Sequence, residues 1–230
     1  MGALDDDTAI EATRPGVWRG EVSDRWSVVG PNGGYLASFM TRALIAASPL
    51  PTPLALNVHF LIPATPGAAT VEIDILRAGR SHVAMAARLV QAELVAVALA
   101  TFGIRRPDCP EVGTLAMPSV PAPDDCAPRS VGPPPSVTIA RRFEHRLPPD
   151  GDPELGGAGN NSPTAGGWTR MTDRDLDDVA VPVFMDSWPA SIWGATGRSP
   201  GAPTVELTVH WRATPRTAWH LARFIPMDPR

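Results

Sequence analysis

Cysteine is scarce in this chain, which argues against two kinds of site. The two cysteines, Cys109 and Cys126, both lie in a proline-rich stretch. Neither has histidine or cysteine partners at the spacing of a metal site, and two isolated thiols do not make a disulfide framework. A single bridge between them is the less favoured alternative. The sequence therefore predicts no zinc site.

Long apolar runs and basic clusters are also absent. No stretch approaches the roughly 18 consecutive apolar residues that a membrane-spanning helix needs. The chain starts with an acidic triplet at 5–7 and no apolar run, so no signal peptide is predicted. The net charge is −4, and no basic stripe with interleaved aromatic residues indicates nucleic-acid binding. We expect a cytoplasmic protein with no membrane span and no nucleic-acid partner.

The chain does contain enough apolar sequence for a core, and it contains a repeat. Apolar residues make up 43% of the chain and charged residues 19%, which favours a packed protein over a disordered one. Residues 54–60 read LALNVHF and residues 205–211 read VELTVHW, at an offset of 151 (205 minus 54). Both copies have the form apolar-x-Leu-polar-Val-His-aromatic. Such a repeat predicts two copies of one supersecondary unit.

The first copy has the pattern of a helix followed by a sheet. Apolar residues recur at helical spacing over 35–47, and the prolines that follow forbid a longer helix. Strands are expected over 17–26, 54–63, 70–77, 82–91 and 94–104. A long apolar helix is buried best by an antiparallel sheet that curls around it, so the predicted fold class is α+β. Gly33 and Gly34, before the helix, would let neighbouring backbone approach its N-terminus closely.

The second copy is less regular. Strands are expected over 137–147, 166–172, 204–212 and 219–224, and a helix over 178–193, capped by Asp177 or Asp178 and interrupted at Pro189. The predicted organisation is a flexible arm over 1–15, an N-terminal unit over 16–106, a proline-rich linker over 107–136 and a C-terminal unit over 137–230.

The repeat offset would place the second copy's equivalent of residues 80–106 past residue 230. We therefore expect a C-terminally truncated second unit that lacks its last strands. An unpaired sheet edge favours association with another chain, so we also expect lowered stability and a homo-oligomer.

Several motifs, in their order and spacing, carry a resemblance to a known family. They are GPNGGYL (30–36), HFLIPA (59–64), LRAGRS (76–81), ALATFG (98–103), GGW (166–168) and FMDSWP (184–189). In these segments the chain resembles the thioesterase-like superfamily of double-hotdog acyl-CoA thioesterases, related to the bacterial acyl-CoA thioesterase II family. The resemblance covers most of residues 15–225. It implies two tandem hotdog units, each a long helix wrapped by an antiparallel sheet.

The resemblance also implies an activity, which is hydrolysis of acyl-CoA to fatty acid and CoA in fatty acid metabolism, without metal, cofactor or covalent intermediate. In the family an Asp, a Thr or Ser, and a Gln hold the attacking water. The Asp corresponds to Asp186 and the Thr to Thr204, whereas the Gln would fall on the strand expected past residue 230. The alternative function is therefore a non-catalytic protein that binds acyl-CoA or an acyl carrier.

The residues themselves bear on these assignments. Asp186 lies in an otherwise apolar helix, where a buried carboxylate is costly unless it is paired or used; the alternative is a position facing solvent. Strict strand alternation would place Thr204 on the polar face with Glu206. A helix N-terminus could stabilise an oxyanion. Candidate substrate-binding residues are Gly33, Gly34, Tyr35, His59 and His210, although one histidine in each repeat is more often structural.

Overall fold

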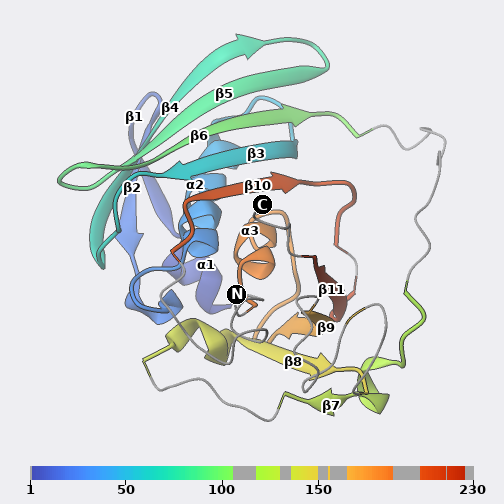
Figure 1. The fold of residues 1–230 in the computed structure, drawn as a ribbon. Helices are drawn as coiled ribbons and strands as arrows, with labels where there is room; N and C mark the ends of the chain where they lie inside the picture. Colours follow the sequence, from blue (N-terminus) through green and yellow to red (C-terminus); the bar gives the residue numbers. More distant parts are fainter. Residues whose placement is uncertain are drawn as a thin grey trace, which may run out of the picture.

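The computed structural model describes residues 2–105, 118–129, 136–149, 155, 165–188, 203–215 and 217–225. Its largest element is a seven-stranded antiparallel sheet that curves over a central helix, α2 (Figure 1). In sheet order the strands are β1 (Ile10–Arg14), β2 (Val17–Val22), β4 (Gly67–Ala78), β5 (His82–Val90), β6 (Leu94–Gly103), β3 (Thr52–Phe60) and β10 (Glu206–His210). The α+β class predicted from the sequence is confirmed.

The central helix α2 (Gly33–Ala47) forms where the apolar spacing predicts it. It begins two residues earlier than expected, because Asn32 caps it by accepting a hydrogen bond from the Tyr35 N–H at 3.0 Å. Helix and sheet bury Phe39 and Met40 completely. A short second helix, α3 (Val181–Met185), packs against α2, and its Val183 N–H donates to Ser38 Oγ at 3.1 Å.

The repeat appears in the structure as a pair of neighbouring strands. β3 and β10 are antiparallel, and Asn57 lies directly opposite Thr208. These two residues are also related by the repeat offset (208 minus 57 is 151), so a local twofold axis passes between them. Asn57 Nδ2 donates to Thr208 Oγ1 at 2.7 Å. The two units therefore share the large sheet across this axis.

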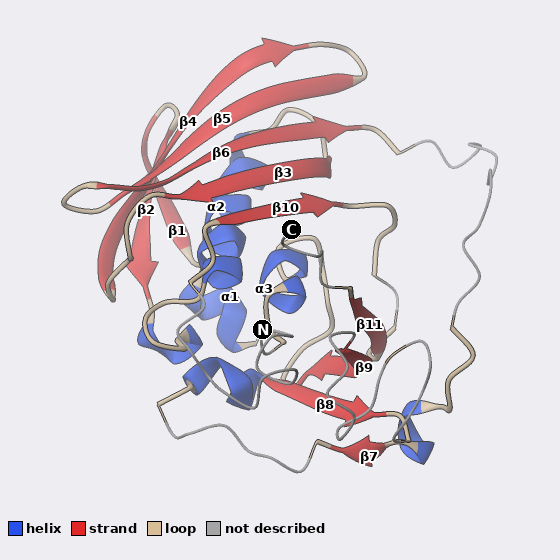
Figure 2. Ribbon diagram, in the orientation of Figure 1, coloured by secondary structure: helices blue, strands red, loops and turns tan. Residues whose placement is uncertain are grey.

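A second, four-stranded sheet lies on the far side of α3 (Figure 2). Its order is β11 (His220–Phe224), β9 (Ala165–Met171), β8 (Phe143–Leu147) and β7 (Ala127–Pro128). Three short 3-10 helices complete the described secondary structure: η1 (Asp24–Trp26), η2 (Pro123–Asp125) and η3 (Thr138–Arg142).

The second unit departs from the predicted elements in three places. The expected strand over 137–147 begins as η3 and extends only from Phe143. Part of the expected linker carries η2 and β7, and its Cys126 is buried. The expected helix over 178–193 is shorter: α3 covers only Val181–Met185, so Asp186 follows the helix and does not lie within it. Asp177 Oδ1 accepts from the Ala180 N–H just before α3. Pro189 and Cys109 lie outside the described residues.

The predicted flexible arm over residues 1–15 is wrong, because this segment folds as α1 (Ala3–Asp7), which is partly buried, and as β1, the edge strand of the large sheet. Leu4 is fully buried. Its acidic residues pair with arginines from both units: Asp5 contacts Arg42 of α2 at 2.9 Å and Arg174 of the second unit at 2.6 Å. The acidic residues by themselves suggested a solvated arm. The fold instead brings them next to arginines that lie far away in the sequence.

Three polar side chains form a row across the second sheet. In the strand register, Thr169 lies between His145 and His220. Thr169 Oγ1 is 3.0 Å from His145 Nδ1 and accepts from Trp188 Nε1 at 2.8 Å. Burial, and secondarily the charge of Arg129, lowers the pKa of His145 to about 4, and burial also lowers the pKa of His220. Both rings are therefore neutral at pH 7.

The low pKa of His145 predicts that the protein loses stability in acid. Because the pKa of His145 is about 4 when folded and 6.5 when unfolded, the unfolded state binds the extra proton between these values. Stability is thus fully present above pH 6.5 and is expected to fall by about 3 kcal/mol as the pH drops to 4. Urea unfolding followed by tryptophan fluorescence across this range measures the loss. His145→Asn, which keeps an acceptor near Thr169 but does not titrate, should flatten the curve; an equally steep curve in this variant would contradict the assignment.

Candidate active site

The candidate site lies where the N-terminus of α2 meets the end of α3 and the residues leading into β10. Asp186 directly follows α3, and its Oδ2 accepts three hydrogen bonds. The donors are Gly34 N–H at 2.8 Å, Asn32 Nδ2 at 2.9 Å and Thr204 Oγ1 at 3.1 Å. Two of these donors come from the first unit and the third from the second unit, so the site exists only when the units are packed together.

Close packing at this point depends on two glycines. A Cβ atom on Gly34 would lie 2.5 Å from the Asp186 Cβ and 2.6 Å from the Pro182 carbonyl oxygen. A Cβ on Gly33 would lie 2.8 Å from the Thr204 Cβ. All three distances are shorter than real Cβ contacts, so only glycine lets α2 approach the two polar side chains this closely. The close approach expected at Gly33 and Gly34 is present.

Thr204 reaches the site because the strand alternation does not extend to it. β10 begins only at Glu206, and Val205 is 69% exposed, although strict alternation would place it with the buried Val209. The Val205 carbonyl still accepts from the Phe60 N–H at 2.9 Å, which holds this segment against β3. Thr204 is therefore half-buried and directed at Asp186, not placed on the polar face as strict alternation would require.

The environment of Asp186 perturbs its ionisation. Burial raises the pKa of the carboxyl, while the hydrogen bonds from Gly34, Thr204 and Asn32 lower it, and the net direction is upward. The positive end of the α2 dipole also favours the ionised form. A carboxylate with a raised pKa that is held in one orientation is suited to act as a general base.

Asn32 was not recognised as a site residue from the sequence. In the structure it caps α2 by accepting from the Tyr35 N–H. The contact of its amide NH2 group with Asp186, 154 residues away, follows only from the fold.

Tyr35 does not fit the substrate-binding role expected for it. The side chain is fully buried and stacks on Trp26 with ring centroids 5.7 Å apart. Its hydroxyl donates to the Asp7 carbonyl at 2.6 Å and accepts from the Ser23 N–H at 2.9 Å. With both partners inside the protein, Tyr35 anchors the N-terminal segment to α2. Burial raises the pKa of its hydroxyl well above the usual value, so the ring stays neutral.

The two repeat histidines are also separated from the site. His59 on β3 and His210 on β10 are both exposed. Their strand neighbours Val58 and Val209 are fully buried. Because successive side chains on a strand point to opposite faces, both histidines lie on the outer face of the sheet, away from α2 and Asp186. Their expected role in substrate binding is not supported.

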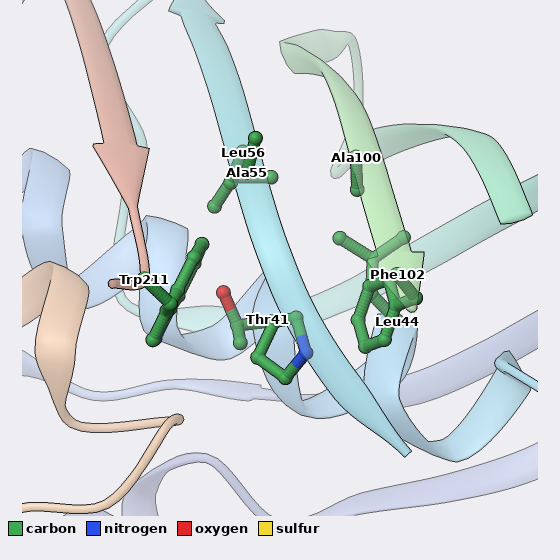
Figure 3. A pocket seen from close by; sticks show the side chains of 8 residues that line it. Thr41, Leu44, Ala55, Leu56, Ala100, Phe102 and Trp211 are labelled. Carbon is green, nitrogen blue, oxygen red and sulfur yellow. The ribbon is translucent and has the colours of Figure 1, made fainter. Parts of the chain in front are cut away.

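An apolar gap lies between α2 and the inner face of the large sheet (Figure 3). The gap is too narrow to hold a water molecule. The residues around it are Thr41, Leu44, Pro53, Ala55, Leu56, Ala100, Phe102 and Trp211. The side-chain donors of the lining already have acceptors: the Thr41 hydroxyl donates to the Ala37 carbonyl at 2.7 Å and Trp211 Nε1 to the Asp178 carbonyl at 3.3 Å.

Two kinds of feature are not found in the described part of the chain. No group of three or more histidine, cysteine or acidic side chains is close enough to hold a metal ion there. Within the same residues, no helix has the length and apolar character needed to cross a bilayer.

Comparison with solved structures agrees with this architecture. A protein from Thermobifida fusca YX, described as a thioesterase II, is 21% identical with a TM-score of 0.84, and the match covers 97% of this chain and 86% of that one. A hot dog-fold protein of unknown function from Alicyclobacillus acidocaldarius is 30% identical with a TM-score of 0.81, covering 94% and 80%. An acyl-CoA thioesterase II from Mycobacterium marinum is 20% identical with a TM-score of 0.60, covering 84% and 69%.

The class of protein is therefore a double hotdog, with two helix-and-sheet units packed around a local twofold axis. Residues 22–103 match the family of acyl-CoA thioesterase N-terminal domains, and residues 123–225 match that of acyl-CoA thioesterase C-terminal domains. The chain belongs to this acyl-CoA thioesterase family. No protein with a curated function matches the sequence.

Proposed function

We propose that this protein hydrolyses acyl-CoA thioesters to a free fatty acid and CoA, with Asp186 as the general base and no metal. The observation that carries the proposal is the Asp186 carboxylate, held by donors from both units at the N-terminus of α2. Burying the carboxylate is costly, its three donors offset part of that cost, and carboxyls with perturbed pKa values cluster at functional sites.

The reaction follows from this geometry. Asp186 orients a water molecule and takes one of its protons while the water oxygen attacks the thioester carbonyl carbon. The tetrahedral intermediate then collapses, the C–S bond breaks, and the proton passes from Asp186 to the departing CoA thiolate. Thr204 holds Asp186 in place by its hydrogen bond.

A helix N-terminus can stabilise the negative oxygen of the intermediate, but not every N–H group here is free to do so. The Gly34 N–H is already bonded to Asp186, and that of Tyr35 to Asn32. In the first turn of α2 only the Gly33 N–H has no acceptor among the described residues. We therefore assign the oxyanion role to Gly33.

Release of free thiol from a series of acyl-CoAs, short to long, tests the proposal with the purified chain. Turnover with at least one chain length is the expected result. Binding can be measured separately by calorimetry with a non-hydrolysable acyl-CoA thioether. Tight binding without turnover would overturn the enzymatic proposal and support a non-catalytic acyl-CoA-binding protein. The cytoplasmic location, the homo-oligomeric state and the truncation of the second unit stay predictions.

Thr204 offers a second test of the same site. Thr204→Val keeps the shape of the side chain but removes the hydroxyl that donates to Asp186 Oδ2. A hydrogen bond to a charged group contributes about 1.5–3 kcal/mol, so kcat/KM is expected to fall roughly 10- to 100-fold. Thr204→Ser keeps the hydroxyl and should retain most activity. Equal activity in the Val and Ser variants would remove Thr204 from the site.

A further inference from the structure

Asn32 joins the cap of α2 to the candidate base. The side chain is 9% exposed, and both ends of its amide are engaged. Oδ1 accepts from the Tyr35 N–H at 3.0 Å. Nδ2 donates to Asp186 Oδ2 at 2.9 Å and also lies 3.3 Å from the Asp186 carbonyl oxygen.

The orientation of this amide follows from the chemistry of its neighbours. A backbone N–H can only donate, so the atom that faces Tyr35 N must be the amide oxygen. The amide nitrogen must then face Asp186. Because the NH2 group can only donate as well, Asp186 has to present an accepting oxygen to it.

The same reasoning separates the two oxygens of Asp186. Oδ2 receives hydrogen bonds from two groups that can only donate, the Asn32 amide and the Gly34 N–H, and from the Thr204 hydroxyl, which can also accept. A proton on Oδ2 could point only at Thr204, which would then lose its own bond to Asp186. Oδ1 receives no hydrogen bond from any described side chain or backbone group. A proton on Oδ1 keeps all three bonds to Oδ2, so Oδ1 is the favoured position.

From this arrangement we propose that Asn32 is a positioning residue that ties down Oδ2 and thereby makes Oδ1 of Asp186 the proton-accepting atom of the reaction. The inference rests on the proposed function, since it deepens the role given there to Asp186. Asn32 belongs to the first hotdog and Asp186 to the second, so the base of one unit is oriented by the helix cap of the other.

The groups that contact the Asp186 carboxyl are uncharged, and this makes the role testable. The groups that act on its carboxyl are the Gly34 N–H and the Asn32 amide from α2 and the Thr204 hydroxyl from the segment before β10. None of them carries a charge, and the first turn of α2 contains no acidic residue. A charge introduced at position 32 would therefore act on Asp186 without any compensation.

The decisive variant is Asn32→Asp, with Asn32→Ser as its neutral partner. Asp and Ser are both good helix caps, so the bond to the Tyr35 N–H and the start of α2 should be kept. Asp removes the donor to Asp186 and adds a like charge, whereas Ser only removes the donor. The acidic limb of the kcat/KM–pH profile is expected to move up by one pH unit or more in Asn32→Asp and by less in Asn32→Ser. On that limb, a move of about one pH unit lowers kcat/KM at a fixed pH roughly tenfold, because tenfold less Asp186 is ionised.

Two further measurements separate the outcomes. Carboxyl ¹³C NMR, with the Asp186 signal assigned by its loss in Asp186→Asn, follows the titration of this residue without any substrate. Thermal unfolding reports whether the cap of α2 is intact. If Asn32→Asp does not fold, the pH profile and the Asp186 titration of wild type are compared with those of Asn32→Ser alone. The proposal is overturned if, in a folded variant, neither the acidic limb of the kcat/KM–pH profile nor the titration of Asp186 moves. If the Asp186 titration moves up but wild type hydrolyses no acyl-CoA, the effect of Asn32 on the Asp186 carboxyl stands, while its role in the reaction falls together with the proposed function.

Discussion

Asp186→Asn is expected to lower kcat for acyl-CoA hydrolysis by a factor of about 10²–10⁴, with little change in acyl-CoA affinity. The amide oxygen can take the place of Oδ2 and accept from Gly34, Asn32 and Thr204, so the local structure should be kept. The amide nitrogen then occupies the position of Oδ1, where it cannot accept a proton from water. Thiol release measures kcat, and calorimetry with a thioether analogue measures binding.

A matched control separates loss of the base from a general effect of removing a carboxylate. Asp74 lies on β4 and is exposed, where it pairs with Arg88 at 2.9 Å. Surface pairs of this kind contribute at most about 1 kcal/mol, so Asp74→Asn should leave both turnover and stability nearly unchanged. Wild-type turnover in Asp186→Asn would place the base elsewhere in the protein.

The second large effect is expected at Gly34. In Gly34→Ala the new methyl group would overlap the Asp186 Cβ and the Pro182 carbonyl oxygen, at 2.5 and 2.6 Å. The carbonyl belongs to the backbone of α3, so no rotamer change relieves the contact and the two helices must separate. Overpacking of this kind costs about 1–3 kcal/mol. A displacement of about 1 Å in the position of Asp186 can lower the rate about 100-fold.

Activity assays together with urea unfolding test this prediction, with Gly30→Ala as the control. Gly30 is exposed, and a Cβ there would meet its nearest neighbour, the Ala64 carbonyl oxygen, at an ordinary 3.7 Å. It lies in the loop that leads into α2, outside the helix contact. Full activity and stability in Gly34→Ala would show that α2 and α3 are not packed as closely as described.

The elements that local patterns could predict are those with their apolar residues at regular spacing. Helix α2 and strands β3–β6 form close to the expected positions, because each segment carries its own burial pattern. The second unit was predicted less well, since η3 replaces the start of an expected strand.

The candidate site was only partly predictable. Asp186 and Thr204 came from the family resemblance. Strict alternation along the strand argued against Thr204, but β10 begins only at Glu206 and Thr204 contacts Asp186. Asn32 was missed, because a cap motif carries no sign of a partner 154 residues away. His59 and His210 were attractive as a repeated pair, yet both occupy the outer face of the sheet.

The sequence by itself determined the α+β class, the internal repeat and the two glycines at the start of α2. These follow from the period of apolar residues and from the absence of side chains, which are local properties. The tertiary structure alone decided that β3 pairs with β10 across a twofold axis, that the acidic N-terminal segment is packed into the core, and that Asn32, Gly34 and Thr204 meet on one oxygen of Asp186. Each of these depends on a contact between segments far apart in the chain, and such contacts are chosen by the packing of the whole molecule.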